Sequence, residues 1–73
     1  MKRFYFDLIG DVPARDFLGH EFASRKKAKA HASFIAHRLG NQHPHFAKRG
    51  NRISVRDEDG TNFYDTPVSL TRH

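Results

Sequence analysis

A helix-like spacing of apolar side chains in the middle of the chain, with strand-like alternation of apolar and polar residues before and after it, limits this chain to a few folds. Small and aliphatic side chains recur at spacings of four, three and four residues and share one helix face, namely Ala28, Ala32, Ile35 and Leu39. Ser24 can accept hydrogen bonds from the free amides of a helix start, and Gly40 favours a left-handed helix end. We therefore expect one helix between Ser24 and Gly40.

The residues before the helix predict a hairpin. Residues 3–9 alternate between apolar and polar side chains, as in a half-buried strand. Gly10, Asp11 and Pro13 are typical of a loop. Residues 15–22 are expected to return as a second, more irregular strand, with a bend at Gly19.

A second hairpin is expected after the helix. Residues 41–50 have no periodicity and predict a loop of about ten residues. Residues 52–56 alternate, residues 57–60 carry a strong turn signal, and residues 61–64 resume strand character. Pro67 should end the strand because it has no amide donor, while Val68 and Leu70 could still cover the core.

These elements predict an α+β fold in the order ββαββ, with residues 1–73 as a single domain. Two hairpins would form a small antiparallel sheet, with the helix packed on one face. The side chains expected to meet the helix are Phe4, Phe6, Leu8, Phe17, Phe22, Ile53, Val55 and Phe63. Those expected on the open face are Arg3, Tyr5, Asp7, Ser54, Arg56, Asn62 and Tyr64. Phe34 falls between the helix faces and should cover an edge of the core.

The charges are unevenly distributed along the chain. Residues 22–56 hold nine of the thirteen lysines and arginines and none of the eight acidic residues. Such a cluster favours an anionic partner, and our leading hypothesis is a basic binding module for nucleic acid, with an acidic protein as another partner of this kind. The cations expected at the helix start and in the following loop are Arg25, Lys26, Lys27, Lys29, Lys48 and Arg49. A solvated basic face is the alternative interpretation.

The open sheet face offers a second candidate surface. Tyr5 and Tyr64 beside Arg3 and Arg56 could stack on the bases of a single strand. The alternative is that these side chains cover the sheet or contact a second copy of the protein. A homodimeric interaction domain without a role in nucleic-acid binding is therefore the competing hypothesis.

Several functional classes find no support in the sequence. No nucleophile elbow, phosphate-binding loop or paired-carboxylate context is present, so we expect neither an enzyme nor a cofactor. His43 and His45 lack the third ligand of a metal site, and no apolar run approaches the length of a membrane span. The absence of cysteine favours the cytoplasm.

Several segments together resemble a family of short bacterial proteins that carry a domain of unknown function. These segments are the aromatic strand at 3–7, Asp16 with residues 19–22, the alanine-spaced helix, and the Val-Arg-Asp-Glu-Asp-Gly turn at 55–60. The resemblance covers roughly residues 3–70. It implies a small stand-alone domain and transfers no activity, ligand or catalytic residue.

Overall fold

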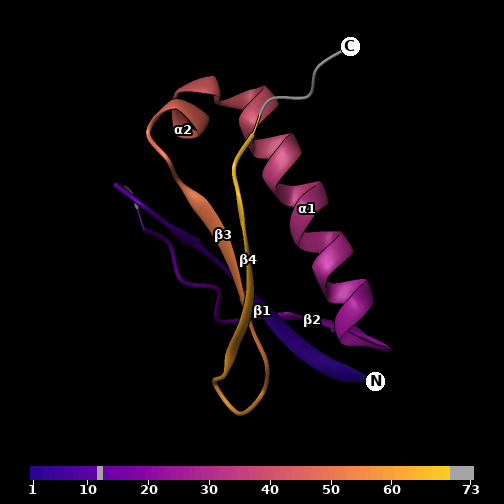
Figure 1. Ribbon diagram of the computed structural model, residues 1–73. Helices are drawn as coiled ribbons and strands as arrows, with labels where there is room; N and C mark the ends of the chain where they lie inside the picture. The colour runs from indigo at the N-terminus through magenta and orange to yellow at the C-terminus, as the bar shows by residue number, and fades with distance from the viewer. Residues whose placement is uncertain (12, 70–73) are drawn as a thin grey trace.

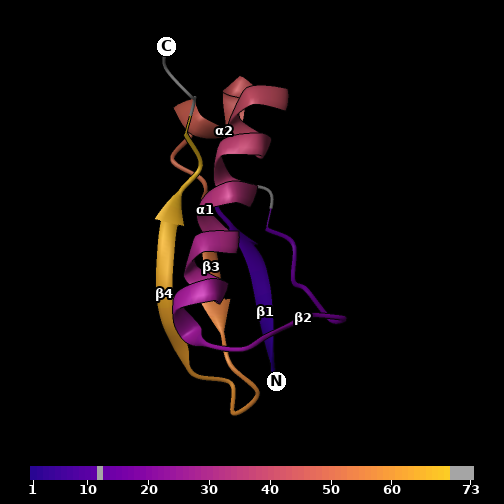
Figure 2. The same ribbon diagram turned by 90° about the vertical axis from the view of Figure 1, so that its right-hand side faces the viewer.

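The computed structural model describes residues 1–11 and 13–69, which form one antiparallel sheet and two helices (Figure 1). The elements in chain order are β1 (Lys2–Ile9), β2 (His20–Phe22), α1 (Arg25–Gln42), α2 (Pro44–Lys48), β3 (Arg52–Arg56) and β4 (Asn62–Pro67). Viewed at right angles, α1 lies across one face of the sheet (Figure 2). The predicted α+β fold of two hairpins and one packed helix is confirmed, with α2 added between α1 and β3.

The two hairpins join through their first strands. The sheet order is β2-β1-β3-β4, so β1 and β3 form its centre although the helices separate them in sequence. Their register runs from Tyr5 opposite Arg56 to Ile9 opposite Arg52. Val68, just after β4, is buried as predicted, and Leu70 lies outside the described residues.

Small side chains allow α1 to lie close to the sheet. The side chain of Ser24 caps the helix by accepting a hydrogen bond from the amide of Lys27, as expected. Ala28, Ala32 and Ala36 are at most 1% exposed. They pack against a core of larger sheet residues that includes Phe4, Ile53 and Val55. Ile35 and Leu39 are half-buried at the flank of this core.

The predicted end of the helix at Gly40 is wrong. The helix continues through this residue to Gln42, and Gly40 is buried against the chain beyond β4. A β-carbon at position 40 would lie 2.1 Å from the carbonyl oxygen of Ser69. Gly40 therefore serves close packing and does not end the helix.

The predicted loop at residues 41–50 is also wrong, because the short helix α2 lies within it. Pro44 occupies the first turn, where a missing amide donor costs nothing. The fully buried Asn51 fixes the exit of this segment: its side-chain amide donates to the carbonyl of Phe46, and its side-chain oxygen accepts from the amide of Asp11.

The predicted second strand at residues 15–22 is reduced to β2, with an isolated bridge between Leu8 and Ala14. Between these two points the chain loops out. Phe17, which was expected in the core, is 80% exposed on this loop. The other seven residues predicted to face the helix belong to the core or pack against it.

A β-bulge changes the face on which Tyr64 lies. The register between β3 and β4 shifts between Val55 and Arg56, which leaves Phe63 as an extra residue on β4. Tyr64 is therefore paired with Val55 and packs against the core, and the ammonium group of Lys29 lies 5.5 Å from its ring centroid. Its predicted position on the open face is wrong.

Candidate functional site

Folding neutralises much of the charge separation seen in the sequence. Among the described residues there are four ion pairs, and each joins a cation from residues 22–56 to an acidic residue outside that range. The pairs are Arg25–Asp57, Arg49–Asp11, Arg52–Asp65 and Arg56–Asp7. The strongly dipolar sequence therefore does not produce an equally dipolar surface.

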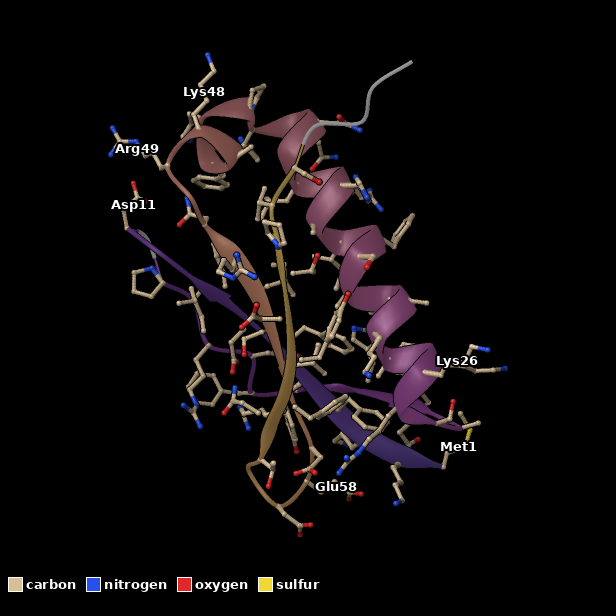
Figure 3. The ribbon with its side chains drawn as sticks, in the orientation of Figure 1. Met1, Asp11, Lys26, Lys48, Arg49 and Glu58 are labelled. Atoms are coloured by element: carbon tan, nitrogen blue, oxygen red, sulfur yellow. The ribbon has the colours of Figure 1, made fainter. Side chains whose placement is uncertain are left out.

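The cations predicted to bind nucleic acid do not form one surface. Lys26 at the start of α1 and Lys48 in α2 lie at opposite ends of the molecule (Figure 3). Arg25 and Arg49 are engaged in ion pairs, and the guanidinium of Arg25 also lies 4.8 Å from the ring centroid of Phe63. Within the described residues, the cations of 22–56 without an ion pair are Lys26, Lys27, Lys29, Arg38 and Lys48.

The predicted stacking surface on the open sheet face is not assembled. Tyr64 lies on the other face, and Tyr5 has the guanidinium of Arg56 at 4.4 Å from its ring centroid. Arg56 Nε also donates to Asp7, whose side chain is largely buried. Arg3 donates to the carbonyl of Leu18 at 2.7 Å. These side chains are thus occupied in holding the fold together.

The loop between Ala14 and β2 is held by charged side chains instead of a strand ladder. The carboxylate of Asp16 accepts hydrogen bonds from the amides of Phe6, Leu18 and Gly19, each at 3.1 Å. Burial raises the pKa of Asp16, but the hydrogen bonds from Gly19, Phe6 and Leu18 outweigh this effect, so that the pKa lies below its ordinary value. The carboxylate therefore replaces a strand as the partner of the β1 edge.

Two further contacts fix the backbone of Asp16 itself. Its amide donates to Asp7 at 2.8 Å, and its carbonyl accepts from Arg56 at 2.7 Å. Gly19 has a φ of +69°, which favours glycine at this turn. Asp7, Asp16, Gly19 and Arg56 all belong to the segments that carry the family resemblance, and their role in this structure is to hold the loop.

The loop presents two large apolar side chains to solvent. Phe17 is 80% exposed and Leu18 is 83% exposed. We call this pair the tip. The tip was not predicted from the sequence, although an aspartate followed three residues later by glycine is a turn signal that would have placed the two intervening residues outside the strand.

A groove lies between α1 and residues 14–20, the segment that contains the loop before β2. Because β2 has three residues and the chain before it loops out, the flank of the core stays partly uncovered. Two adjoining hollows of about 370 and 290 Å³ share His20, Ile35 and Leu39. The residues that line them, apart from those three, include Phe6, Leu8, Ile53, Arg15, Asp16, His31, Phe34 and Arg38.

The floor and rim of this groove differ in chemistry. Phe6, Leu8, Ile35 and Leu39 form an apolar floor, since all four pack against the core. The rim includes Arg15 and Arg38 together with His20 and His31, and the one carboxylate that lines the described groove, that of Asp16, is engaged by backbone amides. The groove is therefore apolar at its base and cationic at its edge.

One stripe of α1 contributes three residues to the rim, His31, Phe34 and Arg38, and Lys27 continues it beyond the groove. Lys27, His31, Phe34 and Arg38 follow one another at spacings of four, three and four residues. The rings of His31 and Phe34 stack at 6.2 Å, and Phe34 is 56% exposed, so its predicted role of covering a core edge is only partial. Of this stripe only Lys27 was among the predicted site residues. The same spacing, one position away from the alanines, was the signal that could have revealed the others.

Two imidazoles face each other at the groove. The ring centroids of His20 and His31 are 5.3 Å apart, and His31 also lies 5.0 Å from Phe6 and from Phe22. Burial lowers the pKa of His31, and the neighbouring His20 lowers it further. His31 is therefore expected to be neutral near pH 7.

Other parts of the described surface are weaker candidates for a binding site. A hollow of about 580 Å³ on the open sheet face is lined partly by Asp7 and Arg56, which are already paired with each other. Within residues 1–11 and 13–69, no three potential metal ligands come together, and no helix is long and apolar enough to span a membrane. His43 and His45 have ring centroids 5.9 Å apart.

Comparison with known proteins places this fold in a family. No curated protein and no solved structure matches the chain. The sequence model of one family, described as Domain of unknown function (DUF6894), matches residues 3–69. This match covers nearly the whole chain and confirms the resemblance to a family without an established activity. The chain therefore belongs to the DUF6894 family.

Proposed function

We propose that this domain is a non-catalytic binding module for an anionic partner, and that its groove binds an acidic segment of a partner protein that also carries apolar side chains. The observation that supports this proposal is the apolar floor of the groove beneath a rim of cations and histidines. The absence of cysteine supports action in the cytoplasm.

The floor supports recognition of apolar side chains. Ile35 and Leu39 are half-buried and line both hollows. Apolar ligand groups placed there would remove these surfaces from water, which is the main favourable term in most protein association. A nucleic-acid strand would instead present phosphates and sugars to most of this aliphatic surface.

The rim supports recognition of carboxylates. Arg15 and Arg38 are exposed and form no ion pair with any described residue. A guanidinium group can bind a carboxylate through two parallel hydrogen bonds. Acidic side chains of the partner would therefore find their complement at both edges of the groove.

A random peptide library displayed on phage tests this proposal. We expect the protein to enrich peptides that combine Asp or Glu with Leu, Ile or Phe. Binding of the enriched peptides should weaken with added salt and fall by at least about tenfold in Arg38→Glu, because a favourable charge pair becomes a repulsive one. Lys48→Glu makes the same charge change at a residue that does not line the groove, and it should have little effect.

The absence of any enriched peptide would contradict the proposal. Enriched peptides without acidic residues, or equal losses in Arg38→Glu and Lys48→Glu, would contradict it as well.

Nucleic-acid binding is the second candidate function. Lys26, Lys27 and Lys29 at the start of α1 are exposed and form no ion pair with a described residue, which favours it. If about three to five phosphates are contacted, log affinity for duplex DNA should fall against log salt with a slope of about −0.9 per contact, and Lys26→Glu with Lys29→Glu should abolish binding. No binding to DNA or RNA at low salt would exclude this candidate.

Self-association through the open sheet face is less favoured. Tyr64 does not lie on that face, and Tyr5 and Arg56 are in contact with each other. The surface that was expected to meet a second copy has therefore lost half of its aromatic side chains.

A further inference from the structure

The tip and the groove are complementary parts of one small chain. Phe17 and Leu18 expose two adjacent apolar side chains, and the groove offers an open apolar floor. We propose that the tip of one copy occupies the groove of a second copy, and that two copies exchange tips to form a symmetric dimer. This proposal does not depend on the proposed acidic partner, although both would use the same groove.

The tip is already ordered for binding. The hydrogen bonds of Asp16 to the amides of Leu18 and Gly19, and of Arg3 to the carbonyl of Leu18, hold the backbone on both sides of the two side chains. A loop fixed in this way loses little conformational freedom when a partner covers it. Exposed apolar side chains on a rigid loop are a surface that favours association.

The tip does not fill the groove of its own chain. The groove wall is formed by residues on either side of it, Ala14 to Asp16 and His20, while Phe17 and Leu18 themselves are almost fully exposed. Figure 2 shows the segment before β2 extending away from α1. These two side chains can therefore enter the groove of a second molecule.

The position of the tip favours reciprocal exchange. Tip and groove wall belong to the same loop, so two molecules that face each other through this loop bring each tip to the other groove. A two-fold arrangement makes each contact twice and closes the assembly, whereas a one-way contact would continue into chains. Four apolar side chains then leave water for one association event.

The charges of the rim determine the conditions under which the dimer forms. Arg15 and Arg38 have no neutralising carboxylate in the tip, which adds only the neutral side chains of Phe17 and Leu18. The groups that face the groove are Arg15, Asp16, His20, His31 and Arg38. Salt should therefore strengthen the dimer by screening repulsion, whereas it should weaken binding of an acidic peptide.

Sedimentation velocity on the full chain, from about 5 to about 500 μM, tests the dimer. We expect concentration-dependent dimerisation that increases with salt. Phe17→Ser combined with Leu18→Ser should raise the dissociation constant by at least about tenfold, because both anchors are lost. Ile9→Ser removes an apolar side chain that is 49% exposed outside the tip, and this control should dimerise like the unaltered protein.

A mixing experiment tests the tip-in-groove arrangement itself. His20→Trp adds bulk to the groove from an exposed position, and Leu39→Lys serves as a second groove variant with its folding checked by circular dichroism. The tip variant and each groove variant, taken alone, should dimerise at least about tenfold more weakly than the unaltered protein. Mixed together they should form a heterodimer weaker than the original dimer, because one intact tip can enter one intact groove.

Three outcomes would overturn the proposal. These are a protein that stays monomeric at all concentrations, a dimer that the tip variant does not weaken, and variants that fail to associate when mixed. Library peptides that bind a monomeric protein would refute the dimer and leave the proposed function intact, while a dimer without peptide binding would do the reverse.

Discussion

The two hairpins of this sheet are closed by different means. The β3–β4 hairpin has five paired positions and a turn in which Asp57 accepts from the amides of Asp59 and Thr61. The chain from β1 to β2 has three paired positions and the isolated bridge between Leu8 and Ala14, and Asp16 and Arg56 hold the loop between them. A backbone ladder needs a continuous strand, whereas charged side chains can hold a loop that departs from the sheet.

This difference explains where the proposed binding surfaces lie. The regular hairpin pairs its backbone groups and covers the core with Phe63 and Tyr64. The irregular one leaves the flank of the core open beside α1 and projects Phe17 and Leu18 into solvent. The side-chain contacts of Asp16 and Arg56 thus allow a domain of this size to keep both an apolar groove and an apolar tip.

The largest expected effect compares two arginines of β3. Arg56→Ala should destabilise the protein by about 3 to 5 kcal/mol, because it leaves the buried carboxylate of Asp7 without its partner. Arg52→Ala removes the exposed pair with Asp65 and should cost at most about 1 kcal/mol. Urea unfolding measures both. Similar losses would mean that the loop is not held by the buried pair.

The next effect concerns the two turn aspartates. Asp16→Ala should cost about 1 to 3 kcal/mol and speed hydrogen exchange at the amides of Phe6, Leu18 and Gly19, which lose their acceptor. Asp57→Ala should cost about 1 kcal/mol, since its turn amides lie at an exposed hairpin end and its ion-pair partner Arg25 is exposed. Unchanged hydrogen exchange at these amides in the Asp16 variant would contradict the role of Asp16 in holding the loop.

A smaller, pH-dependent effect concerns His31 of α1, which lies next to His20 of the irregular hairpin. The pKa of His31 in the folded protein is below its ordinary value of 6.5, because burial and His20 disfavour the imidazolium. The unfolded chain then binds more protons, so stability should fall as the pH drops below 6.5 and level off below the folded pKa. His31→Phe should remove this component from the pH profile of unfolding. An unchanged profile would show that other groups cause it.

The smallest effect is expected at the tip. At concentrations where the protein is monomeric, Phe17→Ser with Leu18→Ser should change stability by less than about 0.5 kcal/mol, because both side chains are exposed. Phe22→Ser in the same hairpin should be clearly more harmful, since this ring packs on the core. Thermal unfolding at low protein concentration makes the comparison. A large loss at the tip would mean that it supports the monomer.

Local patterns predicted the order of the elements well. The alternation at 3–9 and 52–56 and the spacing of Ala28 and Ala32 identified β1, β3 and α1, because each pattern lies within one element. The errors occurred where a distant contact overrides the local preference. Gly40 was read as a helix end because its packing partner, Ser69, is far away in sequence.

The same reason accounts for the errors in the candidate site. Tyr64 was assigned to the open face by counting alternate residues, and a single bulge reverses that count. Phe17 was assigned to the core because Gly19 was interpreted as a bend within a strand, whereas Asp16 and Gly19 form a turn in which Asp16 accepts a hydrogen bond from the distant amide of Phe6. The cations were grouped by proximity in sequence, and their acidic partners lie far along the chain.

The sequence by itself determined the ββαββ order, the buried alanine stripe of α1 and the aromatic core of the sheet, since these depend on periodicity and on apolar burial. The tertiary structure alone decided which cations form no ion pair with a described residue and where the groove opens. Those features arise from interactions through space, such as Arg56 with Asp7 and Asp16, whose partners are up to 49 residues apart. Binding surfaces depend on such contacts, which no local pattern in the chain records.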